Sequence, residues 1–488
     1  MNGLAYTVRS VRRNLLKVVA LALTGACVTT GPAHAATILT QFQGAGLGNS
    51  GYVPPDMGGS VGDGYVMQMV NGVSSIYTPT GTLESQQSLG TFWSGVSGGA
   101  AISDPRVIYD PSSGLWFASA ISTQSSNNNI LIAVSKTSNP TAGFNTFSFA
   151  SASGVFGDFP TLGVNGAAVT IGTNNFSTAG SYIASSVYSI PKASLTAATP
   201  SLGSITRFDN TSSVGFAPEA VTNASGTGTS TSIVSISPSI NNTGISGYTL
   251  STISGANAAG ATLSQTQQYS QPLLNTALLA PTQPGGTTYA AGNSRISSGA
   301  YQSGNNIYFA NIISNGQTDE VAWVILNATN GGVVAKGYLA MSGLNLTYPS
   351  ISANADGTFV IAFNGSGTAN NIGDYYAVCS VSTGQCGTPQ ASFISPASNY
   401  LNAPAGTNRW GDYSWTTVDP TNPNTFWLFQ EYAATNSSWG TVITSISVAA
   451  PEPAGLTLLA VAFAGLGLVR NRQRRVDLPG VGLFGRFG

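Results

Sequence analysis

Short apolar runs separated by turn residues make up most of the chain between Ala36 and Ala450. The runs are rich in β-branched and aromatic residues and end at Gly, Asn, Asp-Pro or Ser-Gly. The three-to-four-residue spacing of an amphipathic helix is almost missing from this region. Strands bounded by such turn residues are typical of all-β proteins, so the pattern predicts an all-β body.

A weak internal repeat organises these runs. Each unit has an apolar run, a turn, and then an aromatic or β-branched strand, and the second strands start near positions 65, 116, 168, 233, 307, 359 and 426. A propeller blade of four strands takes about 40–50 residues, and more with long loops. The spacing predicts a seven-bladed β-propeller over residues 36–449, with Ile38–Phe42 completing the last blade beside Val442–Val448. A pair of β-sandwiches and a β-helix are the alternatives.

The N-terminus has the order of a secretory signal peptide. A basic segment without acids precedes an apolar stretch over residues 18–28, and Ala33-His34-Ala35 follows as an A-x-A cleavage site. We therefore expect residues 1–35 to be removed on export. Arg12-Arg13 also resembles a twin-arginine signal, and Cys27 leaves a lipoprotein as a further alternative.

The C-terminus is built in three parts. Pro451-Glu452-Pro453 ends the body, residues 454–469 are apolar and uncharged, and four arginines follow at Arg470, Arg472, Arg474 and Arg475. A helix over residues 454–469 reaches about 24 Å at 1.5 Å per residue, which is short of a bilayer core of about 30 Å. The arginines would hold their end in the cytoplasm, with residues 476–488 as a cytoplasmic extension.

This order of Pro-Glu-Pro, short transmembrane helix and arginine cluster resembles the PEP-CTERM sorting signal over residues 450–475. Such tails are also labelled as ice-binding protein C-terminal domains. The resemblance implies an exosortase-type sorting enzyme as a partner, an intermediate in the inner membrane, and a final place at the cell surface or in the extracellular matrix. A permanent tail anchor is the alternative.

Charge and histidine content narrow the chemistry. Charged residues make up 7% of the chain, against about 25% in ordinary soluble proteins. Residues 36–450 hold 7 Lys or Arg and 15 Asp or Glu, a net charge of −8, which argues against nucleic acid and anionic lipid as partners. The one histidine, His34, lies in the signal peptide. Histidine-based catalysis and histidine-ligated metal sites are therefore excluded from the mature chain, and we expect no metal and no cofactor.

Two cysteines remain after export. Cys379 ends an apolar strand and Cys386 follows a short turn. An even pair in an oxidising compartment predicts a local disulfide, with two free buried thiols as the alternative.

Acids and arginines recur just before the first strand of successive repeats. Equivalent positions in a propeller gather around one end of the central channel. The candidate binding residues are Asp104, Arg106, Asp158, Glu219, Arg295, Arg409 and Asp412, and Asp56 has the same place in the first repeat. Such a ring is suited to a sugar or a cation. The structural interpretation, in which these residues cap turns and pair between blades, is favoured.

Blocks along the body resemble a group of secreted bacterial propeller proteins. They are Pro54–Asn71, Asp104–Asp110 with Trp116, Asp158–Val164, and Arg409–Ser414 with Asp419-Pro420 and Phe426-Trp427. The group has no established activity, so the resemblance bears on fold and export.

We therefore expect a non-catalytic binding or structural role beside exopolysaccharide. The alternative is a glycan-active hydrolase or lyase of sialidase-like type, with two carboxylates as acid and base and a tyrosine such as Tyr413 as nucleophile. Ice binding is a third hypothesis.

Overall fold

Antiparallel strands build almost all of the described chain, which in this computed structural model is residues 36–448 without 124–126, 225, 238–244, 275–276, 398 and 404–406. Inner strands such as β24 (Thr358–Gly367) are buried along their whole length, whereas outer strands such as β22 (Val333–Leu339) alternate between exposed and half-buried residues. Strands covered on both faces need apolar residues at nearly every position. This explains why the apolar runs of the sequence do not alternate.

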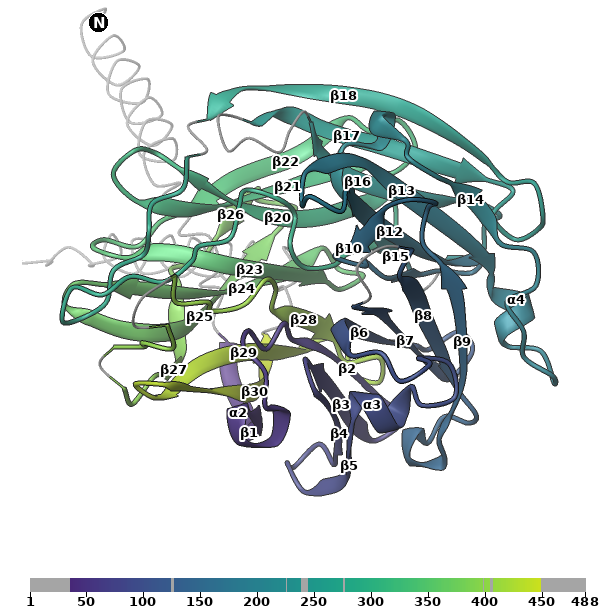
Figure 1. Ribbon diagram of the computed structural model, residues 1–488. Coiled ribbons are helices and arrows are strands. Elements are labelled where there is room, and N and C mark those ends of the chain that lie inside the picture. Colours follow the sequence, from purple (N-terminus) through teal and green to yellow (C-terminus); the bar gives the residue numbers. More distant parts are fainter. Residues whose placement is uncertain are drawn as a thin grey trace, which may run out of the picture. The chain divides into compact units, whose positions relative to one another are not determined.

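The strands pair into successive sheets, which we name by their first and last strands (Figure 1). The first three sheets are β2 (Gly58–Gly62), β3 (Tyr65–Val70), β4 (Val73–Tyr77) and β5 (Leu83–Ser88); β6 (Ile102–Asp110), β7 (Leu115–Ser122), β8 (Asn129–Ser135) and β9 (Phe144–Ala150); and β10 (Phe156–Asp158), β11 (Gly163–Val164), β12 (Ala168–Phe176), β13 (Tyr182–Pro191) and β14 (Thr206–Phe208).

The next two sheets are β15 (Phe216–Thr222), β16 (Thr231–Ser237), β17 (Ile245–Ser254) and β18 (Thr262–Leu274); and β19 (Ala300–Ser303), β20 (Asn306–Ser314), β21 (Asp319–Asn327) and β22. A short parallel pairing of Val221 and Thr222 with Ala300 and Tyr301 joins these two sheets edge to edge. The sixth is β23 (Asn345–Ala353), β24, β25 (Asn370–Ser380), β26 (Gln385–Cys386) and β27 (Gln390–Ile394).

The remaining sheet joins the two ends of the body. It consists of β28 (Trp415–Val418), β29 (Thr425–Thr435), β30 (Ser438–Val448) and the N-terminal strand β1 (Ala36–Gly46). Ile38 lies opposite Ile446 and Phe42 opposite Ile443, which confirms the predicted partner of residues 38–42. The short helices are α2 (Leu47–Ser50), α3 (Leu89–Phe92), α4 (Lys192–Leu195) and the 3-10 turns η1 (Pro140–Ala142) and η2 (Ser212–Val214).

Contacts between the sheets form a closed circuit. The first strands, with β11 in place of β10 for the third sheet, touch in the order β2, β6, β11, β15, β19, β23 and β28, and β28 touches β2 again. Apolar clusters fill the spaces between neighbouring faces, as where Trp93 and Trp116 pack between the β2–β5 and β6–β9 sheets. Closure of this kind is β-propeller-like, and it places the start of every first strand around a common centre.

Two further predictions concern single features. Cys379 and Cys386 form a disulfide across the β25–β26 pairing. No helix within the described residues is long and apolar enough to cross a membrane. The predicted signal peptide (1–35), sorting signal (450–475), transmembrane helix (454–469) and tail (476–488) lie outside those residues.

Candidate functional site

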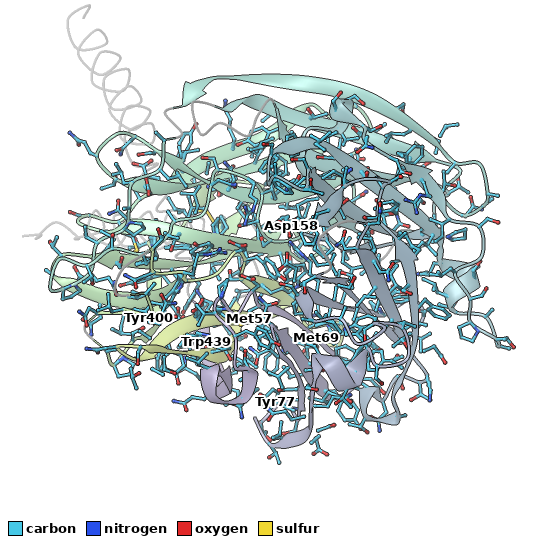
Figure 2. All side chains as sticks on the ribbon, in the orientation of Figure 1. Met57, Met69, Tyr77, Asp158, Tyr400 and Trp439 are labelled. Atoms are coloured by element: carbon cyan, nitrogen blue, oxygen red, sulfur yellow. A yellow bond between two sulfur atoms is a disulfide. The ribbon has the colours of Figure 1, made fainter. Side chains whose placement is uncertain are left out.

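The predicted ring residues separate into two groups. We call Arg106 and Glu219 the inner pair, because both side chains are fully buried and their charged groups are 3.5 Å apart. The other group, the outer cluster, is centred on Asp412, whose carboxylate pairs with Arg295 at 3.2 Å and with Arg409 at 3.1 Å. The outer cluster consists of Asp56, Asp104, Asp158, Arg295, Arg409 and Asp412. Asp158 lies near the centre of the view in Figure 2.

A repeated backbone feature places both groups. Left-handed residues stand at the start of several first strands: Asp56, Asp104, Phe159, Ala217 and Tyr348, with φ between 48° and 57°. The last four each precede a proline. In β6 and β15 a left-handed residue followed by proline coincides with a register shift in the pairing with the next strand. The shift lies between Ser103 and Arg106 in β6 and between Phe216 and Glu219 in β15. Proline has no N–H to pair, so it is tolerated at such bulges, which redirect neighbouring side chains.

Asn71 connects two acids of the outer cluster. Its Nδ2 donates to Asp56 Oδ2 at 2.7 Å, and its Oδ1 accepts from the backbone N–H of Asp104 at 2.9 Å. The backbone N–H of Asp412 donates to the other oxygen of Asp56 at 2.7 Å. These bonds hold Asp56, Asp104 and Asp412 together, although the three acids precede or lie in strands of three different sheets. The sequence analysis did not identify Asn71 as part of the site.

Burial raises the pKa of three acids of the outer cluster, Asp56, Asp104 and Asp158. Burial raises the pKa of Asp104 to about 7, and the charges of Asp158 and Asp412 add to the effect. Burial and the charge of Asp412 also raise the pKa of Asp158 above its usual range, while Arg295 opposes the shift. The same causes raise the pKa of Asp56 well above its usual range. The shifts favour the protonated forms of Asp56, Asp104 and Asp158, which is the direction that an acid catalyst requires.

The inner pair is enclosed by aromatic rings. The Arg106 guanidinium lies 4.2 Å from the ring centre of Tyr413 and 4.8 Å from that of Phe159. Burial raises the pKa of Glu219 to about 8, against the opposing charges of Arg106 and Arg295. A separation of 3.5 Å is longer than the ~2.7–2.9 Å of a charge-assisted hydrogen bond. The contact between the Arg106 guanidinium and the Glu219 carboxyl group is thus weaker than a hydrogen-bonded ion pair, although both groups are buried in the core.

Tyr413 is not placed to act as a nucleophile. Its side chain is buried, and its hydroxyl donates to the carbonyl of Pro105 at 3.1 Å. Burial raises its pKa well above the usual range. This corrects the prediction that Tyr413 could attack a sugar, because a buried phenol that resists ionisation is a poor nucleophile.

A pocket of about 480 Å³, which we call pocket A, opens beside the outer cluster. Its lining residues are Asp158, Phe159, Asn174, Phe176, Ser181, Tyr182, Phe216, Asn293, Arg295 and Asp412. The inner pair does not line it. Pocket A has the size of small-molecule sites, about 300–1,000 Å³, and its lining combines four aromatic residues with six polar or charged ones.

Several lining residues were missed by the sequence analysis. Phe176 and Tyr182 flank the β12–β13 turn, and Phe216 opens β15. They are aromatic residues at strand ends, which the sequence cannot distinguish from core residues. A proline near the start of several first strands recurs in the sequence, and it could have marked the positions where the backbone redirects neighbouring side chains. Among the described residues, no group of three His, Cys, Asp or Glu side chains is arranged to hold a metal ion.

The fold resembles that of solved glycosidases. The chain is 8% identical to an α-L-arabinofuranosidase from Fusarium graminearum, with a TM-score of 0.39, over 86% of this chain and 98% of that one. It is 9% identical to an α-L-arabinanase from Penicillium chrysogenum, with a TM-score of 0.40 over 84% and 98%. A Trypanosoma rangeli sialidase matches at 12% identity and a TM-score of 0.29, over 83% and 62%. No family model and no curated protein sequence matches the chain.

These comparisons correct one prediction. The sequence analysis favoured a non-catalytic binding or structural role, whereas the similar structures are glycan-active hydrolases and fit the alternative better. The non-catalytic hypothesis is therefore set aside. At such identities and TM-scores the likeness concerns the class of fold alone, so the chemistry has to be argued from the side chains of pocket A.

Proposed function

We propose that the protein is a glycan hydrolase and that pocket A is its active site. The observation that supports this is a pair of carboxyl groups, Asp158 and Asp412, which line one pocket in unlike surroundings. Burial and the charge of Asp412 raise the pKa of Asp158 and so favour its protonated form, whereas two guanidinium groups pair with the carboxylate of Asp412. Glycoside hydrolysis needs one carboxyl group as an acid and one as a carboxylate, and different environments separate the two roles.

In this mechanism Asp158 protonates the glycosidic oxygen as the bond from that oxygen to the anomeric carbon breaks. The negative charge of Asp412 stabilises the positive charge that develops on the sugar ring. Water then supplies the hydroxyl group of the new anomeric centre, and its second proton restores Asp158. Arg295 and Arg409 position Asp412 through their ion pairs. Asp56 and Asp104 do not line pocket A, but Asp104 interacts electrostatically with Asp158 and Asp412, and Asp56 interacts with Asp412.

The activity is tested on the mature body with a panel of neutral and acidic polysaccharides, by measuring new reducing ends. We expect release from at least one glycan, and loss of release in Asp158→Asn and in Asp412→Asn. The control is Asp63→Asn, since Asp63 is exposed in the β2–β3 turn and away from pocket A. A panel that yields no reducing ends, or variants that cleave as well as the parent, would refute the proposal.

We also propose that the sheets are the seven blades of a β-propeller. Support comes from the closed order of contacts between first strands and from the pairing of β1 with β30. In that arrangement the outer cluster lies at one end of the central channel, where loops from several blades meet.

We further propose that the protein is exported and processed at its C-terminus. Support comes from the basic, apolar and A-x-A order of residues 1–35 and from the Pro-Glu-Pro, apolar and arginine order of residues 450–475. An exosortase-type enzyme is the proposed partner, and the cell surface or extracellular matrix is the proposed destination. Mass spectrometry of secreted protein should find a chain that starts near Ala36 and ends near Pro451–Pro453. A membrane-bound chain that retains Arg470 would mean a permanent anchor.

A further inference from the structure

A second pocket adjoins pocket A at the proposed acid. Pocket B, of about 370 Å³, is lined by Thr123, Phe156, Asp158, Phe176, Ser177, Thr178 and Gly180. Asp158 and Phe176 line both pockets. The proposed acid therefore lies at the boundary between two hollows rather than at the bottom of one.

The local pairing explains this placement. Strand β10 pairs with β12 so that Phe156 lies opposite Phe176 and Asp158 opposite Asn174. The β12–β13 turn then carries Ser177 and Thr178 past Asp158 on the side of pocket B. On the side of pocket A, the rings of Phe176, Tyr182 and Phe216 follow one another with centres 5.9 and 5.2 Å apart.

Both pockets offer what a sugar ring needs. Half-buried aromatic rings present flat apolar faces to the C–H face of a sugar, and the hydroxyl and amide groups beside them suit its hydroxyls. Pocket B contributes Thr123, Ser177 and Thr178, and pocket A contributes Asn174, Ser181 and Asn293. The two hollows therefore resemble each other in chemistry.

The charges favour a neutral ligand. Among the described residues that line the two pockets, Arg295 is the one cation, and it pairs with Asp412 at 3.2 Å. Asp158 is an acid common to both pockets. A uronic acid or a sulfated sugar would find Arg295 already paired with Asp412 and no other cation among these lining residues to receive its charge, at a cost in affinity.

We infer that a neutral glycan chain lies across Asp158, with sugar residues in both pockets, so that the chain is cut at an internal bond. The cleavage part rests on the proposed function, whereas the binding part does not. A site with one closed pocket would remove terminal sugars, but pocket B leaves room for the chain to continue beyond the acid.

Binding is tested first on Asp158→Asn, which keeps the side-chain shape and removes the acid. The ligands are linear arabinan, xylan and β-glucan oligosaccharides of increasing length, measured by calorimetry. We expect affinity to rise with length until both pockets are filled. Thr178→Trp, which fills pocket B, should lower the affinity for the long oligosaccharides about tenfold and leave that for the shortest ligand unchanged.

The matched control is Thr329→Trp, because Thr329 is exposed in the β21–β22 turn and lines neither pocket. Phe176→Leu, which keeps apolar bulk but loses the flat ring, provides a second variant and should weaken binding of all lengths. Absence of binding by every neutral oligosaccharide, or equal binding of long chains by Thr178→Trp and Thr329→Trp, would overturn the inference.

Cleavage is tested with the active protein on the polysaccharide that binds best. Cutting at internal bonds should lower the viscosity early, while few reducing ends have formed. Release of single sugars with unchanged viscosity would overturn internal cleavage and leave the hydrolase intact. Length-dependent binding without any reducing ends would instead support the two-pocket site and refute the proposed hydrolase.

Discussion

The inner pair and the outer cluster use the same residue types and come from similar positions in the repeat, yet they differ in surroundings. Arg106 and Glu219 are fully buried under aromatic rings. Arg409 and Asp412 retain 46% and 24% of their side-chain exposure, and Asp412 lines pocket A. An acid beside an arginine is therefore a core feature in one case and a candidate site in the other.

Access to solvent separates the two roles. A fully buried ion pair gives little net stability, because the loss of hydration offsets the attraction between the charges. A partly exposed pair can keep a carboxylate charged and still reach a ligand. We therefore expect substitutions in the inner pair to change the stability of the fold and substitutions in the outer cluster to change the rate of hydrolysis.

The largest expected difference lies in hydrolysis rates. Asp158→Asn should lower kcat by about 10²–10⁴-fold, the usual contribution of a general acid, with little change in the free energy of unfolding. Glu219→Gln, which keeps the shape of a buried side chain outside pocket A, should keep the rate within the same order of magnitude. Similar losses in both variants would remove the distinction between the two groups.

The next effect is on stability. Arg106→Ala should lower the free energy of unfolding by about 2–5 kcal/mol, because it leaves a cavity where a fully buried side chain packs against aromatic rings. Replacing both members, as in Arg106→Met with Glu219→Leu, should restore most of that loss. Urea unfolding at pH 7 measures both variants. A loss below about 1 kcal/mol in Arg106→Ala would mean that the pair is not buried in solution.

The pH dependence of stability comes third. Asp104, with a pKa of about 7, and Glu219, with a pKa of about 8, hold protons in the folded state that they release near pH 4 when unfolded. Their contributions are complete below about pH 4 and decline as pH rises to about 7 for Asp104 and about 8 for Glu219.

Each such group should lower the free energy of unfolding by at most about 1.4 kcal/mol per pH unit within its range. Urea unfolding between pH 4 and 8 should therefore show a decline that is shallower in Asp104→Asn. An identical slope in this variant would contradict a protonated Asp104.

The smallest effect is expected at the exposed edge of the outer cluster. Arg409→Gln should change the free energy of unfolding by no more than about 0.5 kcal/mol, as is usual for exposed ion pairs. Arg295→Gln should cost more, since its side chain is 12% exposed and its guanidinium lies 4.2 Å from the ring centre of Phe159. Equal costs in the two variants would show that burial does not distinguish these arginines.

Much of the strand arrangement was predictable. The expected second strands start within two residues of the observed ones, as at Tyr65 in β3, Ala168 in β12 and Asn306 in β20. These strands are buried on both faces, so their apolar runs are unbroken and their ends are marked by turn residues. The equivalence of the ring positions was also visible, because it follows from the repeat.

The division of the ring into two groups was not predictable. Arg106 and Arg295 each precede a short β-rich run, and both lie against the ring of Phe159, but Arg106 is also covered by Tyr413 from another repeat and is fully buried. The aromatic wall of pocket A likewise comes from the β12–β13 turn and the start of β15. Neither arrangement can be predicted from the residues adjacent in the sequence.

The sequence by itself determined the strands, their turns, the recurrence of acids and arginines at the strand starts, and the disulfide partners, because each depends on residues close along the chain. The tertiary structure alone decided which of those charges face a pocket, which keep a proton, and which are enclosed. The reason is that solvation and pKa depend on side chains brought in by neighbouring sheets, and closure of the ring is what brings them together.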